Sequence, residues 1–165
     1  MLRNYIGDSA FFKGYNLYLT QNKFSSAEAD DLRHAFEKVT GEDLNWFFNQ
    51  WFYRGGHPVL NVSYKWDSEK KKEIVTIKQM QDLKTNPLYK LPLDIDFYFE
   101  NSIERKKITV TKSVQEFEFP LAEKPKDFDH RNFRLLGNDL GVHFQRSNPQ
   151  HVLLNCGIGY VEVPA

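Results

Sequence analysis

The spacing of apolar residues changes near residues 55–58, and this change divides the chain into two parts. Before Gly55-Gly56, apolar residues recur every three or four positions, as on one face of an α-helix. After His57-Pro58, apolar and polar residues alternate, as in a strand with one buried face. The pattern predicts an α+β protein with N-terminal helices in residues 1–56, followed in residues 57–124 by the strands of an antiparallel β-sandwich or a small barrel.

Four helices are predicted in the first part. The first is a short helix in residues 1–6, and Asp8 is placed to cap the second, at about residues 9–22. Ser25 and Glu28 have the spacing of a capping box for the third helix, which Gly41 ends. Thr40 and Asp43 start the fourth, at about residues 43–54. The predicted apolar stripes are Phe11, Tyr15, Tyr18 and Leu19 in the second helix, and Leu32, Ala35, Phe36 and Val39 in the third.

Strands are predicted wherever the period is two. Leu60, Val62, Tyr64 and Trp66 share one face of "VLNVSYKW", and "EIVTIKQM" follows after a charged turn. In "KLPLDIDFYFE", the residues Leu91, Leu93, Ile95, Phe97 and Phe99 face one side, and Asp94, Asp96 and Glu100 face the other. "KKITVTK" and "EFEFPL" alternate in the same way. Residues 125–165 contain only short apolar pieces, and their structure stays open.

The helix at residues 43–54 contains a run of large aromatic residues. Leu44, Phe47, Phe48 and Trp51 fall on one face, and Trp46 and Phe52 widen it. A helix that is apolar over much of its circumference is typically buried, so a protein core or interface is favoured. A stacking platform for a ligand would come with more cationic residues than Arg54 alone. A membrane-surface helix would need a lysine-rich polar face, which this helix lacks.

Composition excludes several classes of function. The chain has 165 residues, with 22 lysines and arginines balanced by 22 aspartates and glutamates. A neutral chain has no general field that would attract nucleic acid or an anionic membrane. No apolar run approaches the roughly 20 residues of a membrane span, and "MLRNYIGD" has no apolar core of a signal peptide. The single cysteine, Cys156, excludes an internal disulfide and a cysteine-based zinc cluster.

Candidate catalytic and metal-binding residues are sparse. The histidines His34, His57, His130, His143 and His151 include no pair with the spacing of a helical zinc site. Asp127, Asp129 and His130 are three possible metal ligands in a charged loop, where solvation is the simpler interpretation. The pair Asp30-Asp31 suits the first turn of a helix. The pair Asp94 and Asp96 projects from the polar face of a strand. No nucleophile elbow, phosphate loop or dinucleotide motif is present.

Three pieces of the sequence nevertheless resemble one known family. "MLRNYIGDSAFFKGYNLYL", "AEADDLRHAFEKVTGEDL" and "FFNQWFYRGGHPVLNV" occur in this order within residues 1–64. Together they resemble the M1 family of zinc aminopeptidases, in the stretch that runs from the end of the thermolysin-like catalytic domain into the following β-sandwich. The strands to about residue 124 agree more loosely, and the tail after Lys124 departs from the family pattern.

The resemblance implies that the zinc and catalytic motifs belong to a segment that precedes this one. In the family, H-E-x-x-H, a further glutamate ligand, G-x-M-E-N and a catalytic tyrosine all come earlier, and none has a counterpart here. We therefore assign no catalytic, cofactor-binding or metal-ligating residue to this chain. The implied partner is the remainder of a catalytic domain, packed on the aromatic helix at residues 43–54.

The resemblance thus implies an inactive scaffold piece of an M1-type aminopeptidase, an enzyme that in its intact form removes N-terminal residues from peptides with the help of zinc. The alternative is a stand-alone β-sandwich module that binds a protein or a glycan through an open sheet edge or exposed loops. A small metal-dependent enzyme built on Asp127, Asp129 and His130 is a further alternative. Neither a signal peptide nor a membrane span is predicted in this chain.

Overall fold

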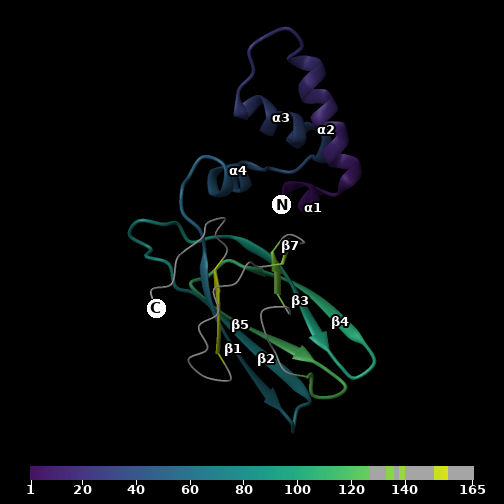
Figure 1. Ribbon diagram of the computed structural model, residues 1–165, viewed down its shortest axis with the longest axis vertical. Helices are drawn as coiled ribbons and strands as arrows, with labels where there is room; N and C mark the ends of the chain where they lie inside the picture. Colours follow the sequence, from purple (N-terminus) through teal and green to yellow (C-terminus); the bar gives the residue numbers. More distant parts are fainter. Residues whose placement is uncertain (127–132, 136–137, 140–150, 156–165) are drawn as a thin grey trace, which may run out of the picture. The chain divides into compact units, whose positions relative to one another are not determined.

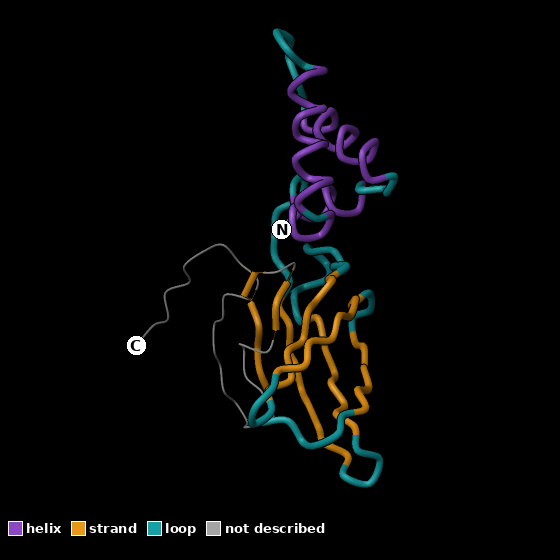
Figure 2. The backbone as a smooth tube through the Cα atoms, turned by 90° about the vertical axis from the view of Figure 1, so that its right-hand side faces the viewer, coloured by secondary structure: helices purple, strands orange, loops and turns teal. Residues whose placement is uncertain are grey.

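The computed structural model describes residues 1–126, 133–135, 138–139 and 151–155 (Figure 1). The chain forms two compact units, Met1–Gly55 and Gly56–Ala165. Figure 2 shows that the helices belong to the first unit and the strands to the second. The predicted α+β class, with helices followed by antiparallel sheets, is confirmed.

The helical unit contains four helices in its described residues: α1 (Leu2–Ile6), α2 (Asp8–Gln21), α3 (Ala29–Thr40) and α4 (Asn45–Trp51). The predicted stop at Gly41 is confirmed, because this residue adopts the left-handed conformation at φ 72° that glycine tolerates best.

Three residues predicted to cap or start a helix do not do so, and in each case the side chain has another partner. Asp8 does not cap α2, because its carboxylate binds the Arg3 guanidinium at 2.7 Å. The capping box of α3 consists of Glu28 and Asp31, because the Ser25 hydroxyl donates to the Asn22 carbonyl in the preceding turn. Helix α4 begins at Asn45, because the Asp43 carboxylate accepts the Asn45 N–H in a turn before the helix.

Helices α2 and α3 pack closely at Gly14. Phe36 is 1% exposed, and its ring stacks on that of Phe11 with 5.4 Å between the centroids. A Cβ atom at Gly14 would clash with the ring of Phe36. The packed face of α2 therefore runs through Phe11 and Gly14, and Tyr15 and Leu19 of the predicted stripe are exposed.

Helix α4 has the predicted buried face. Leu44, Phe47 and Phe48 are buried, whereas Phe52 is 61% exposed. Tyr5 of α1 contacts α4 through the rings of Trp46 and Phe47, with centroid distances of 5.3 and 6.4 Å. Phe47 and Phe48 are therefore packed inside the protein, whereas Trp46 and Trp51 are half-buried and Phe52 and Tyr53 are exposed.

The second unit consists of two four-stranded antiparallel sheets. One has the order β5-β2-β1-β8 and the other β4-β3-β6-β7. The strands are β1 (Val59–Asp67), β2 (Lys72–Gln79), β3 (Leu91–Tyr98), β4 (Ile103–Val110), β5 (Val114–Pro120), β6 (Phe133–Leu135), β7 (Asn138–Asp139) and β8 (His151–Asn155).

The two sheets pack on each other through the faces that the alternation predicts. The ring of Phe97 on β3 lies 5.0 Å from that of Phe119 on β5, which belongs to the other sheet. The fully or nearly fully buried apolar residues of the five long strands are Leu60, Val62, Val75, Ile77, Leu91, Leu93, Ile95, Phe97, Val110 and Phe119.

The segment after Lys124, whose structure the sequence left open, contributes strands to both sheets. Strand β6 pairs with β3, with Leu93 opposite Leu135. Strand β8 pairs with β1, with Val62 opposite Val152. Among the described residues, no helix has the length and apolar character needed to cross a bilayer.

We expect that replacing Gly14 with alanine will destabilise the helical unit. Overpacking a well-filled core costs about 1–3 kcal/mol, whereas alanine gains only about 1 kcal/mol over glycine in helix propensity. Urea denaturation followed by far-ultraviolet circular dichroism would measure the change in the free energy of unfolding. The matched control is Gly55→Ala, where the added Cβ meets no atom within 4 Å. Equal effects of the two substitutions would contradict the close packing of α2 on α3.

Candidate functional site

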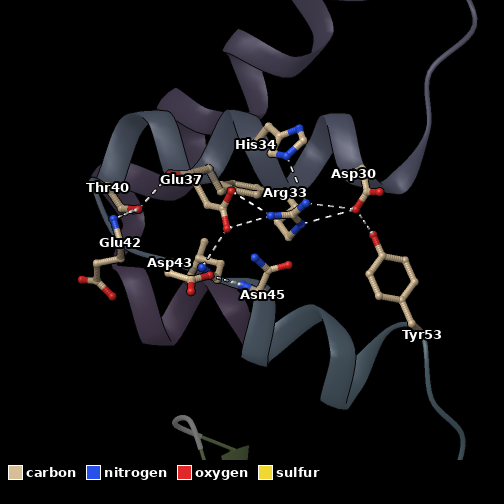
Figure 3. Close-up of polar contacts among 11 residues, drawn as sticks. Asp30, Arg33, His34, Glu37, Thr40, Glu42, Asp43, Asn45 and Tyr53 are labelled. Carbon is tan, nitrogen blue, oxygen red and sulfur yellow. Dashed lines mark hydrogen bonds and ion pairs between the residues drawn. The ribbon is translucent and has the colours of Figure 1, made fainter.

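The most connected polar cluster of the helical unit is centred on Arg33 of α3 (Figure 3). Its guanidinium donates to both carboxylate oxygens of Glu37 at 3.0 Å and to Oδ1 of Asp30 at 3.3 Å. His34 Nε2 lies 3.0 Å from Arg33 Nη2. The Arg33 and Glu37 side chains are only 11% and 19% exposed, which limits the screening of this pair by water.

This cluster connects α3 to the residues on either side of α4. Glu37 Oε1 accepts the Leu44 N–H at 2.9 Å, where α4 begins. The Tyr53 hydroxyl, just beyond the end of α4, donates to Asp30 Oδ1 at 2.7 Å. Figure 3 shows Asp30 and Glu37 on opposite sides of Arg33, each directed toward its contact in the α4 region. The carboxylates therefore hold α4 in place along α3.

The Asp30–Tyr53 contact shifts the pKa values of both groups. The hydrogen bond from Tyr53, assisted by Arg33, lowers the pKa of Asp30 below its usual value. The same bond raises the pKa of Tyr53. Because the folded pKa of Asp30 is the lower one, its contribution to stability is present above the ordinary carboxyl range and is lost as the pH falls through the folded pKa.

A second ionic cluster lies in the β-unit, around Asp96 of β3. Arg105 of β4 binds both carboxylate oxygens of Asp96, at 2.6 and 2.7 Å. Arg134 of β6 approaches Asp96 at 3.9 Å. Asp96 is 1% exposed, and the hydrogen bonds from Arg105 outweigh burial and lower its pKa. A buried carboxylate with a bidentate arginine is typical of a structural ion pair.

Three of the four paired carboxylates noted in the sequence, Asp30, Asp31 and Asp96, have structural roles. Asp31 accepts the Glu28 N–H at 2.9 Å in the capping box of α3, and Asp30 binds Arg33 and Tyr53. Asp96 binds arginine, although the sequence pattern placed it on a polar face and gave no sign that it is buried. Asp30 and Asp31 belong to the helical unit, and Asp94 and Asp96 belong to the β-unit.

Comparison with known proteins agrees with the resemblance found in the sequence. Residues 1–51 match the family model described as the Peptidase family M1 domain. Aminopeptidase N of Escherichia coli strain K12 is 30% identical over 100 residues, which cover 61% of this chain and 11% of that protein. Probable aminopeptidase 1 of Sulfurisphaera tokodaii is 28% identical over 120 residues, which cover 72% of this chain and 14% of the relative.

The chain is related to the M1 aminopeptidases. A solved structure, Legionella pneumophila aminopeptidase A in complex with aspartic acid, matches with a TM-score of 0.60 and 20% identity, over 72% of this chain and 14% of that one. At this identity the likeness concerns the fold alone. The chain therefore corresponds to about a seventh or less of the length of each of these three proteins.

Relation to the M1 aminopeptidases implies zinc in intact members of the family. In the part of the chain that the structure describes, no three or more His, Cys, Asp or Glu side chains are grouped so that they could hold a metal ion. Asp127, Asp129 and His130 lie outside the described residues. The described residues of this M1-like chain therefore do not fit a zinc site.

Sequence reasoning also missed the burial of Glu73 of β2, a titratable side chain that the structure places in the core. It is 2% exposed. The alternation along β2 did indicate this burial, because Glu73 faces the same side of the strand as the core residues Val75 and Ile77.

The Tyr53 hydroxyl can be removed to test the connection between α3 and α4. We expect Tyr53→Phe to raise the pKa of Asp30 toward its usual value, because the largest cause of the lowered pKa is lost. Carbon-detected NMR titration of the aspartate carboxyl groups would measure the shift. The control Tyr18→Phe removes a phenolic hydroxyl from α2 and retains the Asp30 contact. An unchanged Asp30 titration in the Tyr53 variant would show that the hydrogen bond does not form in solution.

Proposed function

We propose that this chain is a scaffold segment of an M1-type zinc aminopeptidase. Residues 1–56 would form the closing helices of a catalytic domain, and residues 57–124 the start of the β-sandwich that follows it. The match of residues 1–51 to the M1 peptidase domain carries the proposal. The architecture of helices followed by antiparallel sheets and the likeness to a solved aminopeptidase support it.

The role of this segment is to position and brace, and the chemistry belongs to the rest of the enzyme. A zinc ion in an intact relative would activate water for attack on the first peptide bond. The described residues of this chain hold carboxylates in ion pairs with arginine, at Arg33 and at Arg105. Carboxylates fixed in this way are suited to holding secondary structure together, and they are not available as general bases.

The proposed partner of the helical unit is the remainder of the catalytic domain. The sequence predicted this contact on residues 43–54, where Phe52 and Tyr53 follow the end of α4 and are exposed. Helix α2 offers a further apolar face, because Phe12, Tyr15 and Leu19 recur at helical spacing and are 56%, 46% and 53% exposed. Exposed apolar groups that recur along one helix are typical of a surface that packs on another protein segment.

A surface hollow of about 520 Å³ adjoins this face. It is lined by Phe12, Lys13, Asn16, Leu17, Thr20 and Val39. It lies along α2 and includes one residue of α3, so side chains of a packed neighbour could enter beside the exposed phenylalanine. We therefore extend the proposed interface from residues 43–54 to the face of α2 that Phe12, Tyr15 and Leu19 form.

We expect the purified chain to contain no stoichiometric zinc and to release no amino acid from peptides with a free N-terminus. Elemental analysis after dialysis against zinc, together with a chromogenic aminopeptidase assay, would test both points. About one zinc per chain with measurable peptidase activity would overturn the scaffold proposal and direct attention to Asp127, Asp129 and His130. A metal-free chain that binds a protein or glycan through its sheets would instead favour the interaction module.

The exposed face of α2 should make the isolated chain associate and bind hydrophobic dyes. We expect the double substitution Phe12→Ser and Leu19→Ser to reduce dye fluorescence and concentration-dependent association in sedimentation velocity. The matched control is Phe24→Ser, because Phe24 is 97% exposed but follows the end of α2. If the control reduces association as much as the double variant does, the α2 face is not the interface.

A further inference from the structure

Glu73 is a carboxyl group that faces the interior of the β-unit. Along β2, alternate residues from Glu73 to Gln79 are buried, and Glu73 itself is 2% exposed. In the sheet register its neighbours on the same face are Trp66 of β1 and Phe119 of β5. Phe119 contacts Phe97 of the opposite sheet, so Glu73 lies beside the contact between the two sheets.

The segment 121–126 crosses between the sheets at the same end of the unit. At its start, the Leu121 N–H donates to the Lys71 carbonyl, two residues before Glu73, at 3.0 Å. At its end, the Lys126 N–H donates to the Tyr98 carbonyl, next to Phe97, at 2.7 Å. Leu121 and Pro125 are buried. Two backbone hydrogen bonds therefore hold this segment over the end of the sandwich where Glu73 lies.

Within the described residues, no hydrogen bond or ion pair holds the Glu73 carboxyl group. The charge that acts on it is that of Lys124, an exposed residue of segment 121–126. The neighbouring strands β1, β3 and β5 present Trp66, Phe97 and Phe119, which carry no charge. Tyr64 of β1 lies on the same face of its strand as Trp66. Glu104 and Lys106 of β4 lie on the same face of their sheet as Phe97, and they form an ion pair with each other.

Burial in these surroundings raises the pKa of Glu73 to about 7, although Lys124 acts in the opposite direction. The folded protein therefore retains a proton that the unfolded chain has already lost. The folded form is then favoured at acidic pH, and its stability falls as the pH rises from the ordinary carboxyl range through the folded pKa.

We propose that Glu73 and the segment 121–126 form a pH-sensitive latch on the β-unit. While Glu73 is protonated, the segment is closed and the neutral carboxyl group stays in the core. When the carboxyl group ionises, its proton passes to solvent, and the segment opens so that water and the Lys124 ammonium group reach the carboxylate. The opening breaks the hydrogen bonds of Leu121 and Lys126 and leaves the strand ladders intact.

Amide hydrogen exchange of the full chain tests the latch. After correction for the intrinsic pH dependence of exchange, protection of the Leu121 and Lys126 amides should fall by about tenfold or more between about pH 6 and pH 8. In Glu73→Gln, which keeps a neutral side chain of the same size, protection should not change with pH. A fall in the wild type that persists in this variant, or an equal fall across all strands, would overturn the proposal.

A second variant keeps the test decisive if Glu73→Gln does not fold. Lys124→Gln changes an exposed residue and removes the cation that favours ionised Glu73. The pH at which protection of Lys126 falls should then be higher than in the wild type. An unchanged midpoint would show that Lys124 does not stabilise the open form as proposed.

Discussion

The burial of Phe36 against the bare backbone of Gly14 determines how the helical unit is assembled. Because residue 14 has no side chain, α3 approaches α2 closely enough for Phe36 to be enclosed. Helix α3 in turn carries Arg33 and Glu37, which reach the start of α4, and Asp30, which reaches Tyr53 beyond its end. The position of α4 therefore depends on the contact between α2 and α3.

Ion pairs also join elements of structure in the β-unit, but there the buried carboxylate costs desolvation free energy. Asp96 is removed from water, and its desolvation is offset only because Arg105 supplies two short hydrogen bonds. Asp30 is more exposed, so its bonds orient the chain more than they stabilise it. In both units, a carboxylate from a pair noted in the sequence joins elements of structure: Asp30 joins α3 to Tyr53, and Asp96 joins β3 to β4.

Periodicity predicted the elements well, because it reports directly on which side of an element meets the core. The alternation placed Leu93, Ile95 and Phe97 correctly, and the helical spacing did the same for Phe47 and Phe48. Helix starts were less predictable, because several residues near each start could cap it, and the choice depends on competing partners such as Arg3 for Asp8. The burial of Glu73 was missed because a carboxyl group is normally exposed to water, whereas the alternation along β2 indicates a buried position.

Local patterns of apolar and polar residues do not show which strands pair with each other. Strand β8 closes the first sheet by pairing with β1, the first strand of the unit. A nascent chain therefore exposes the free edge of β1 until the segment that contains β8 has left the ribosome. Contacts of such long sequence separation form slowly, and an unpaired edge meanwhile invites pairing with other chains. Chaperone protection during synthesis would matter most in this interval.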